Sequence, residues 1–78
     1  MYRILIVEDD PVITETLCAY MGRWGMEARG VEDFQNVLRE FAVFDPQLVL
    51  MDISLPFFDG YHWCAEIRKI STAPIIFI

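Results

Sequence analysis

The sequence predicts an α/β fold in which short parallel strands alternate with helices. Apolar runs without a polar interruption stand at 4–7, 48–51 and 75–78, as in strands that are buried on both faces of a parallel sheet. Segments with apolar residues at helical spacing lie between these runs. This alternation favours a parallel sheet with right-handed crossovers, because each helix returns the chain to the same end of the sheet.

The first strand is expected at 4–7, and the helix that follows it should begin at Pro11 with Asp10 as its N-cap. Gly25 ends this helix. A single apolar stripe is expected along it, consisting of Ile13, Leu17, Tyr20, Met21 and Trp24.

A short, weak strand is expected at 26–31, followed by a second helix at about 32–41. The apolar positions of that helix are Phe34, Val37, Leu38 and Phe41. Pro46 then forces a turn, because it restricts Asp45 and is unable to continue a helix. The buried strand 48–51 follows directly.

The segment 54–60 is predicted to be a loop, since it contains two residues that break regular structure. A third helix is expected at 61–70, with Tyr61, Cys64 and Ile67 facing inward. The last strand, 75–78, should again be buried. The predicted order is therefore β-α-β-α-β-α-β, with no internal repeat or linker.

Composition restricts the functions that this segment can have. The chain has 78 residues and is 55% hydrophobic, which suffices for a core, although so small a domain buries only about 60% of its extended surface. Its formal charge of -6 disfavours contact with nucleic acid or anionic membranes and suits a cation instead. Without a signal peptide or an apolar segment of membrane-spanning length, the sequence predicts a cytoplasmic protein.

The two cysteines, Cys18 and Cys64, belong to no CxxC pair, and His62 is the only further candidate ligand. We interpret them as packed thiols in a reducing compartment, with a disulfide or a zinc site as the alternative. For His62, Trp63 and Cys64 together we expect structural roles.

Acidic residues follow two of the predicted strands. Glu8, Asp9 and Asp10 follow the first, and Asp52 follows the strand that ends at Met51. If these strands are neighbours, their carboxyl ends bring three or four carboxylates to one edge of the sheet. A hard divalent cation would relieve the repulsion, and Mg²⁺ fits because it needs only one or two carboxylates. Helix capping is the alternative role, which we favour for Asp10.

The segments ILIVEDDP (4–11) and LVLMDISLPFFDG (48–60) together resemble the receiver domain of two-component response regulators, and the resemblance extends over all 78 residues. It implies a flavodoxin-like (CheY-like) sheet with strand order 2-1-3-4. It also implies a phospho-acceptor module with weak self-catalysed phosphorylation and dephosphorylation, and not an enzyme that turns over metabolites.

By this resemblance, Asp52 takes a phosphoryl group from a sensor histidine kinase and becomes an aspartyl phosphate. Asp9 would bind Mg²⁺ directly and Glu8 through water, while Asp52 and the backbone carbonyl of Ser54 complete the protein ligands. The residues expected to shape the loop at the acceptor are Pro56, Asp59 and Gly60.

Two shorter segments carry a finer resemblance. VEDD (7–10) is similar to the winged-helix (OmpR/PhoB-type) branch, and DGYHWCAEIRKISTAPIIFI (59–78) is similar to regulators that respond to bacitracin and other cell-envelope-active peptides. This implies transcription regulation through a DNA-binding output domain of the parent protein. Residues 1–78 would be the N-terminal part of the receiver domain. The family's Ser or Thr after the fourth strand and its later Lys are absent, and Lys69 on the third helix is not that lysine.

Without the rest of the domain, 74–78 would be an apolar edge strand, which predicts an oligomeric or aggregation-prone chain. Three other functions agree less well with the sequence. An aspartate-nucleophile phosphohydrolase needs an acid where Ser54 stands, and a nucleotide- or flavin-binding half-domain needs a Gly-rich loop where EDDP (8–11) stands. A degenerate receiver used as a scaffold would have no need of the full set Glu8, Asp9 and Asp52.

Overall fold

The computed structural model describes all 78 residues, and the seven elements follow the predicted order. They are β1 (Arg3–Val7), α1 (Pro11–Arg23), β2 (Glu27–Gly30), α2 (Val37–Phe44), β3 (Leu48–Met51), α3 (Gly60–Arg68) and β4 (Ile75–Phe77). None of the three helices has the length and apolar character needed to span a bilayer.

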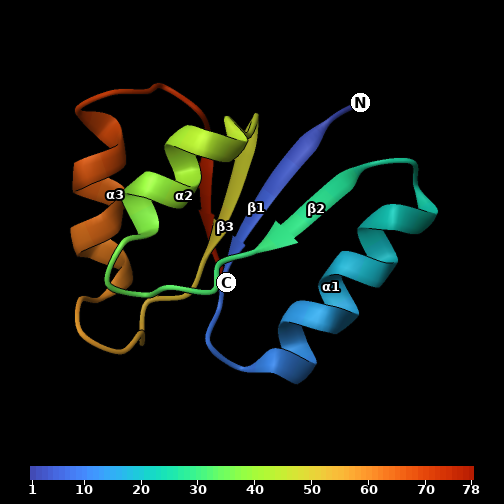
Figure 1. Ribbon diagram of the computed structural model, residues 1–78, viewed down its shortest axis with the longest axis horizontal. Coiled ribbons are helices and arrows are strands. Elements are labelled where there is room, and N and C mark those ends of the chain that lie inside the picture. Colours follow the sequence, from blue (N-terminus) through green and yellow to red (C-terminus); the bar gives the residue numbers. More distant parts are fainter.

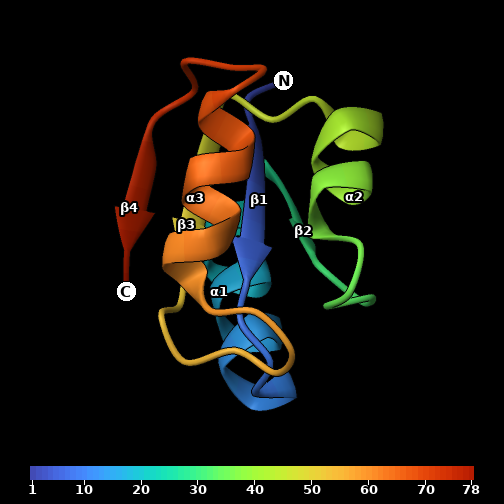
Figure 2. The same cartoon turned by 90° about the vertical axis from the view of Figure 1, so that its left-hand side faces the viewer.

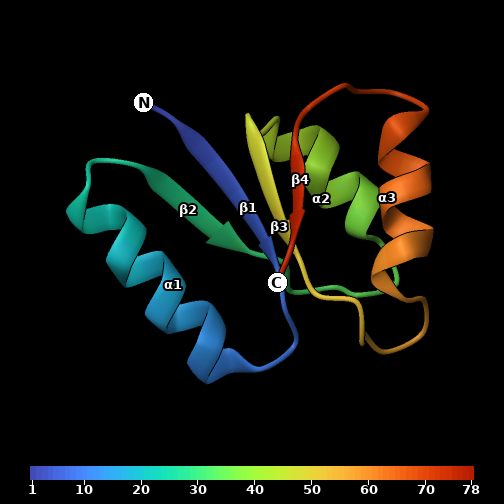
Figure 3. The ribbon, with the colours of Figure 1, turned by 180° about the vertical axis from the view of Figure 1, so that it is seen from behind.

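The strands form one parallel sheet in the order β2-β1-β3-β4, which confirms the predicted 2-1-3-4. One face of the sheet carries α1, and the other carries α2 and α3 (Figure 1). The views from the side and from behind show β4 at the sheet edge, beside β3 (Figures 2 and 3). In the register of the central pair, Val7 lies opposite Met51, so β1 and β3 end at the same level.

The larger part of the core lies between the sheet and the helices α2 and α3. It is a cluster of Leu5, Val7, Val31, Val37, Phe41, Phe44, Val49, Met51, Trp63 and Ile67. The other face buries only Ile4, Ile6 and Leu50 fully, under half-buried side chains of α1. The central strands therefore carry apolar residues on both faces, as their uninterrupted sequences predict.

The ends of α1 agree with the prediction, but its apolar stripe is partly wrong. The Val12 N–H donates to Asp10 Oδ1 at 2.9 Å, and Gly25 follows the helix with φ +77. Leu17 and Met21 are half-buried against the sheet, whereas the predicted Ile13, Tyr20 and Trp24 are exposed. Thr14 and Cys18 take the inward places instead, because the row 14-17-18-21 is the one that faces β1 and β2.

The second helix begins later than predicted, at Val37. The preceding residues form a turn in which Asp33 accepts hydrogen bonds from the Gln35 N–H (3.0 Å) and from Asn36 Nδ2 (2.8 Å). This local bonding competes with helix formation. Phe34 is therefore outside the helix, although it still packs against the core.

The inward face of α3 also differs from the prediction. Ile67 is buried and Cys64 half-buried, but Tyr61 is 59% exposed and its ring lies 5.2 Å from that of Phe77. Trp63 takes the core position, because the helix begins at Gly60 and the row 60-63-67 faces the sheet. The free cysteines Cys18 and Cys64 lie on helices that cover opposite faces of the sheet.

The last strand forms as predicted, but it is not buried. Ile75 is half-buried, while Ile76 is 51% exposed and both Phe77 and Ile78 are exposed. The reason is its place at the edge of the sheet, where one side has no strand.

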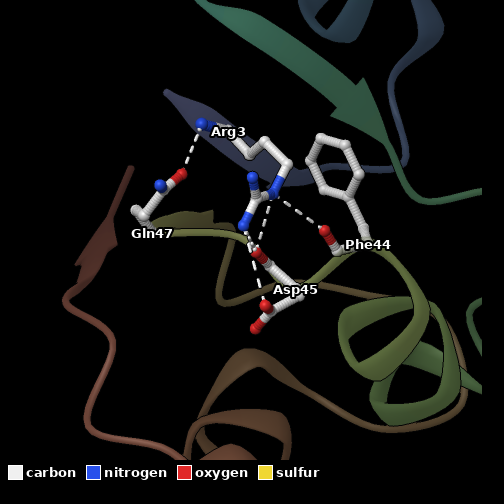
Figure 4. A network of polar contacts seen from close by, with 4 residues as sticks. All are labelled: Arg3, Phe44, Asp45 and Gln47. Carbon is white, nitrogen blue, oxygen red and sulfur yellow. Dashed lines mark hydrogen bonds and ion pairs between the residues drawn. The ribbon is translucent and has the colours of Figure 1, made fainter. Parts of the chain in front are cut away.

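Arg3 ties the start of β1 to the end of α2 (Figure 4). Its Nε donates to the carbonyls of Phe44 (3.1 Å) and Asp45 (2.9 Å), and Nη2 donates to the Asp45 carbonyl at 2.8 Å. The Gln47 side chain accepts from the Arg3 N–H at 2.6 Å. These contacts satisfy carbonyls at a helix end that the helix itself leaves without partners.

Candidate functional site

Three carboxylates meet at the carboxyl ends of the central strands. Glu8 follows β1 and Asp52 follows β3, and the Asp52 N–H donates to the Val7 carbonyl at 2.9 Å. Glu8, Asp9 and Asp52 each place an oxygen within 4.8 Å of the others. Glu8 is only 8% exposed, Asp52 is half-buried and Asp9 is exposed. The parallel register thus brings together acids that are more than forty residues apart in the chain.

Glu8 is held by bonds from its own neighbourhood. Its Oε2 accepts the Asp10 N–H at 3.1 Å, and its carbonyl accepts the Thr14 hydroxyl at 3.0 Å. Burial raises the pKa of Glu8 above its ordinary value of 4.5; the bond from Asp10 opposes this shift, and the charge of Asp52 adds to it. The negative charge at this edge is therefore incompletely compensated by the protein.

Asp10 is separate from this group. Its side chain is occupied by the Val12 N–H, so it acts as the N-cap of α1, the role predicted for it.

The loop 53–59 closes against the backbone of Asp52. The Gly60 N–H donates to the Ile53 carbonyl at 2.9 Å, and a Cβ at position 60 would collide with the Asp52 carbonyl oxygen. Asp59 caps α3 by accepting the His62 N–H at 2.9 Å. Gly60 is thus required by close approach of two backbone segments.

The other two loop residues named from the sequence are exposed. Ser54 donates its N–H to Asp52 Oδ1 at 3.3 Å, which orients that carboxylate. Pro56 accepts the Phe58 N–H at 2.9 Å, which makes a tight turn around Phe57. The ligand role of the Ser54 carbonyl stays a prediction.

Sequence reasoning missed Phe57. This residue has φ +69, and its side chain is 69% exposed. An apolar residue between Pro56 and Phe58 carries no sequence signal for a positive φ, which is uncommon for a bulky side chain. A glycine or asparagine at this position would have indicated it.

An open groove of about 500 Å³ adjoins the site on the side of α1, next to Glu8 and Asp9. Glu8 and Asp9 belong to its wall, and Glu15 and Glu32 add two further acids. The surroundings of the site therefore increase its negative charge.

Residues 4–78 match the sequence profile of the response regulator receiver domain. Two curated relatives from Bacillus subtilis align over all 78 residues: an uncharacterized transcriptional regulatory protein, YvcP, at 53% identity, and the sensory transduction protein BceR at 40%. The chain spans about a third of their length, 33% and 34% respectively.

Solved structures show the same similarity. The N-terminal domain of the nisin resistance regulator NsrR, a lantibiotic response regulator, is 43% identical with a TM-score of 0.91, over 99% of this chain and 65% of that one. The response regulator TrrA of Thermotoga maritima, solved in complex with the histidine kinase ThkA, is 36% identical with a TM-score of 0.88, over 99% and 67%. These findings confirm the predicted resemblance to receivers of peptide-responsive regulators.

Proposed function

The chain belongs to the response regulator receiver domain family, and we propose that its Asp52 accepts a phosphoryl group from a sensor histidine kinase, with Mg²⁺ as the cofactor. The observation that carries this proposal is the convergence of Glu8, Asp9 and Asp52 within 4.8 Å at the carboxyl edge of the sheet. Because it belongs to this family, the chain is a signalling domain. The proposal adds the acceptor residue, the metal ion and the phosphoryl donor.

Asp52 supplies the nucleophile. One of its carboxylate oxygens forms a bond to phosphorus while the bond between phosphorus and the histidine nitrogen breaks, and the imidazole leaves with that electron pair. The product is an aspartyl phosphate. Asp52 suits this role because it is half-buried at a strand end and oriented by the Ser54 N–H, so its carboxylate is held in place yet accessible.

The residues around Asp52 fit a magnesium ion. They offer hard oxygen donors in a site of excess negative charge, where burial disfavours the ionised form of Glu8. In the proposal, Asp9 binds the ion directly, Glu8 binds it through water, and the Ser54 carbonyl contributes a neutral oxygen. When bound, Mg²⁺ would neutralise the charge of the incoming phosphoryl group and of the carboxylate that attacks it.

The wider role concerns a whole protein, since the relatives YvcP and BceR are about three times as long as this chain. We propose that phosphorylation controls a DNA-binding output domain outside residues 1–78, in the cytoplasm, where ATP charges the kinase. Residues 1–78 would then accept and release phosphate without turning over a small metabolite.

The acceptor is tested by titrating the full-length chain with beryllofluoride and Mg²⁺, and by labelling it with acetyl phosphate followed by mass spectrometry of the intact protein. We expect wild type to bind beryllofluoride and to gain one phosphoryl group, and Asp52→Ala to do neither. Asp59→Asn is the matched control, because this acid lies in the same loop but is engaged in capping α3. An unchanged response in Asp52→Ala would remove Asp52 from the acceptor role.

A further inference from the structure

Phe57 occupies a strained backbone conformation in the loop between β3 and α3. With φ +69 and the Phe58 N–H bonded to the Pro56 carbonyl at 2.9 Å, it is the centre of a γ-turn of the rare positive-φ kind. Such a turn is strained in a residue other than glycine. Strain of this kind persists where surrounding structure imposes it, and it concentrates at sites of binding or switching.

The side chains of Phe57 and Phe58, on either side of this turn's last peptide bond, have different surroundings. Phe58 lies over α3, with its ring stacked on His62 at 4.4 Å and edge-on to Trp63 at 5.6 Å. Phe57 joins no aromatic pair, lies outside both core clusters and is 69% exposed. The turn therefore leaves a large apolar ring mostly in solvent, outside the core of this chain.

The tip of this loop stands at the edge of the sheet where the phosphoryl group must arrive. The loop 53–59 begins next to Asp52 and returns to it at Gly60, and it protrudes beside the turn that joins β1 to α1 (Figure 2). A protein that brings a phosphohistidine into bonding distance of Asp52 must cover this edge. Phe57 is among the exposed side chains that it would meet.

The charge at this edge repels the phosphoryl group that a donor carries. Glu8, Asp9, Asp52 and Asp59 are all acidic, and none of the six basic residues lies in the segments 8–10 or 52–60. A single divalent cation offsets part of this repulsion at the reacting group, but it does not hold a protein partner in place. Apolar contacts offset this repulsion without adding charge, and exposed aromatic side chains commonly contribute much of the binding energy at protein interfaces.

We propose that Phe57 anchors the sensor histidine kinase over Asp52 by inserting into an apolar cleft beside the phosphohistidine. The inference rests on the proposed phosphoryl transfer and adds to it the contact that selects a protein donor over a small one. The strained turn keeps the ring pre-positioned, so that docking requires no ordering of the loop.

The test compares two phosphoryl donors on the full-length chain with Mg²⁺. One donor is acetyl phosphate. The other is a histidine kinase that has been autophosphorylated with ATP. It is chosen as the histidine kinase of the source organism that labels wild type fastest. For Phe57→Gly, which accepts the positive φ and removes the whole side chain, we expect the ratio of the kinase rate to the acetyl phosphate rate to fall about tenfold, equivalent to about 1.4 kcal/mol. The loss should be a higher half-saturating concentration of the receiver.

Two variants separate docking from other effects. Phe57→Leu keeps an apolar side chain and should recover most of the ratio, while Val43→Ala shortens a similarly exposed apolar side chain on α2 and should keep the wild-type ratio. A wild-type ratio in Phe57→Gly, or an equal fall in Val43→Ala, would overturn the proposal. If neither donor labelled wild type at Asp52, the proposed function itself would fail, which is a different outcome from an unchanged ratio.

Discussion

At the scale of single residues, the buried charge of Glu8 bears on what the site binds. Three carboxylates within 4.8 Å repel one another, and the most buried of them has its pKa raised mainly by that burial. A protein selected only for stability would replace Glu8 by an uncharged residue, because nothing in the fold compensates its charge fully. Its presence is understandable if a cation occupies the site during function.

We predict that the burial of Glu8 makes the free energy of unfolding depend on pH. The folded-state pKa of Glu8 lies above its unfolded value near 4.5, so the native state binds its proton more tightly. In metal-free protein this contribution is fully present below the unfolded pKa and is lost as the pH rises through the folded pKa. Glu8→Gln should not show this loss, and it should be more stable than wild type at neutral pH without metal.

Urea unfolding in chelator across the mildly acidic to neutral range measures this difference. Mg²⁺ should stabilise wild type at neutral pH and stabilise Glu8→Gln less. The matched control is Glu15→Gln, an exposed acid on the first part of α1, which should follow wild type. If Glu8→Gln and wild type lost stability in parallel on raising the pH, burial of this carboxyl would not be the cause.

Among the elements, the loop between β3 and α3 depends most on a backbone contact. It returns so close to β3 that a Cβ at Gly60 would overlap the Asp52 carbonyl, and the contact is with backbone that has little freedom to move. Gly60→Ala should therefore destabilise the fold by about 2 kcal/mol. It should also weaken beryllofluoride binding, because the loop would shift at the acceptor.

Gly22 provides the comparison within the same chain. It lies near the end of α1, and a Cβ there would meet no atom within 4 Å. Gly22→Ala should be neutral or stabilise by about 0.5–1 kcal/mol, since alanine favours the helix. Thermal and urea unfolding of both variants measure these values, and similar effects at positions 60 and 22 would refute the close-contact argument.

Particular elements show which parts of the fold could be predicted from the sequence. The strands 4–7 and 48–51 were recognisable because they are buried on both faces, and the acids after them followed from the carboxyl-edge rule. The inward faces of α1 and α3 were less predictable, since both helices carry aromatic residues on several sides. The burial of Trp63 and the exposure of Tyr61 depend on helix rotation, which the sheet decides.

Backbone conformations in loops were the least predictable. Asp45 and Phe57 both have positive φ without being glycine, and each is held by contacts outside its own position. The Arg3 hydrogen bonds to the Asp45 carbonyl join segments more than forty residues apart, so no local pattern announces them. For Phe57 the γ-turn is visible only once the loop has closed on Gly60.

At the scale of the whole molecule, the two edge strands of the sheet differ in how well they are protected against pairing with another chain. β2 carries the charged Glu27 and Arg29, which discourage pairing with another chain, whereas β4 carries only Ile75, Ile76 and Phe77. Ile76 lies opposite Leu50, on the face that α1 covers only in part, whereas Ile75 packs against the core cluster on the other face. A polypeptide of these 78 residues alone should therefore self-associate through β4.

Sedimentation velocity over a range of concentrations tests this prediction. Wild-type residues 1–78 should form dimers or larger species, and Ile76→Lys should shift them toward monomer, because a charge on an edge strand opposes pairing with a second copy. Val43→Lys adds the same charge on the exposed side of α2 and should leave the association in place. A wild-type monomer at all concentrations, or equal dissociation by both lysines, would show that the β4 edge does not drive assembly.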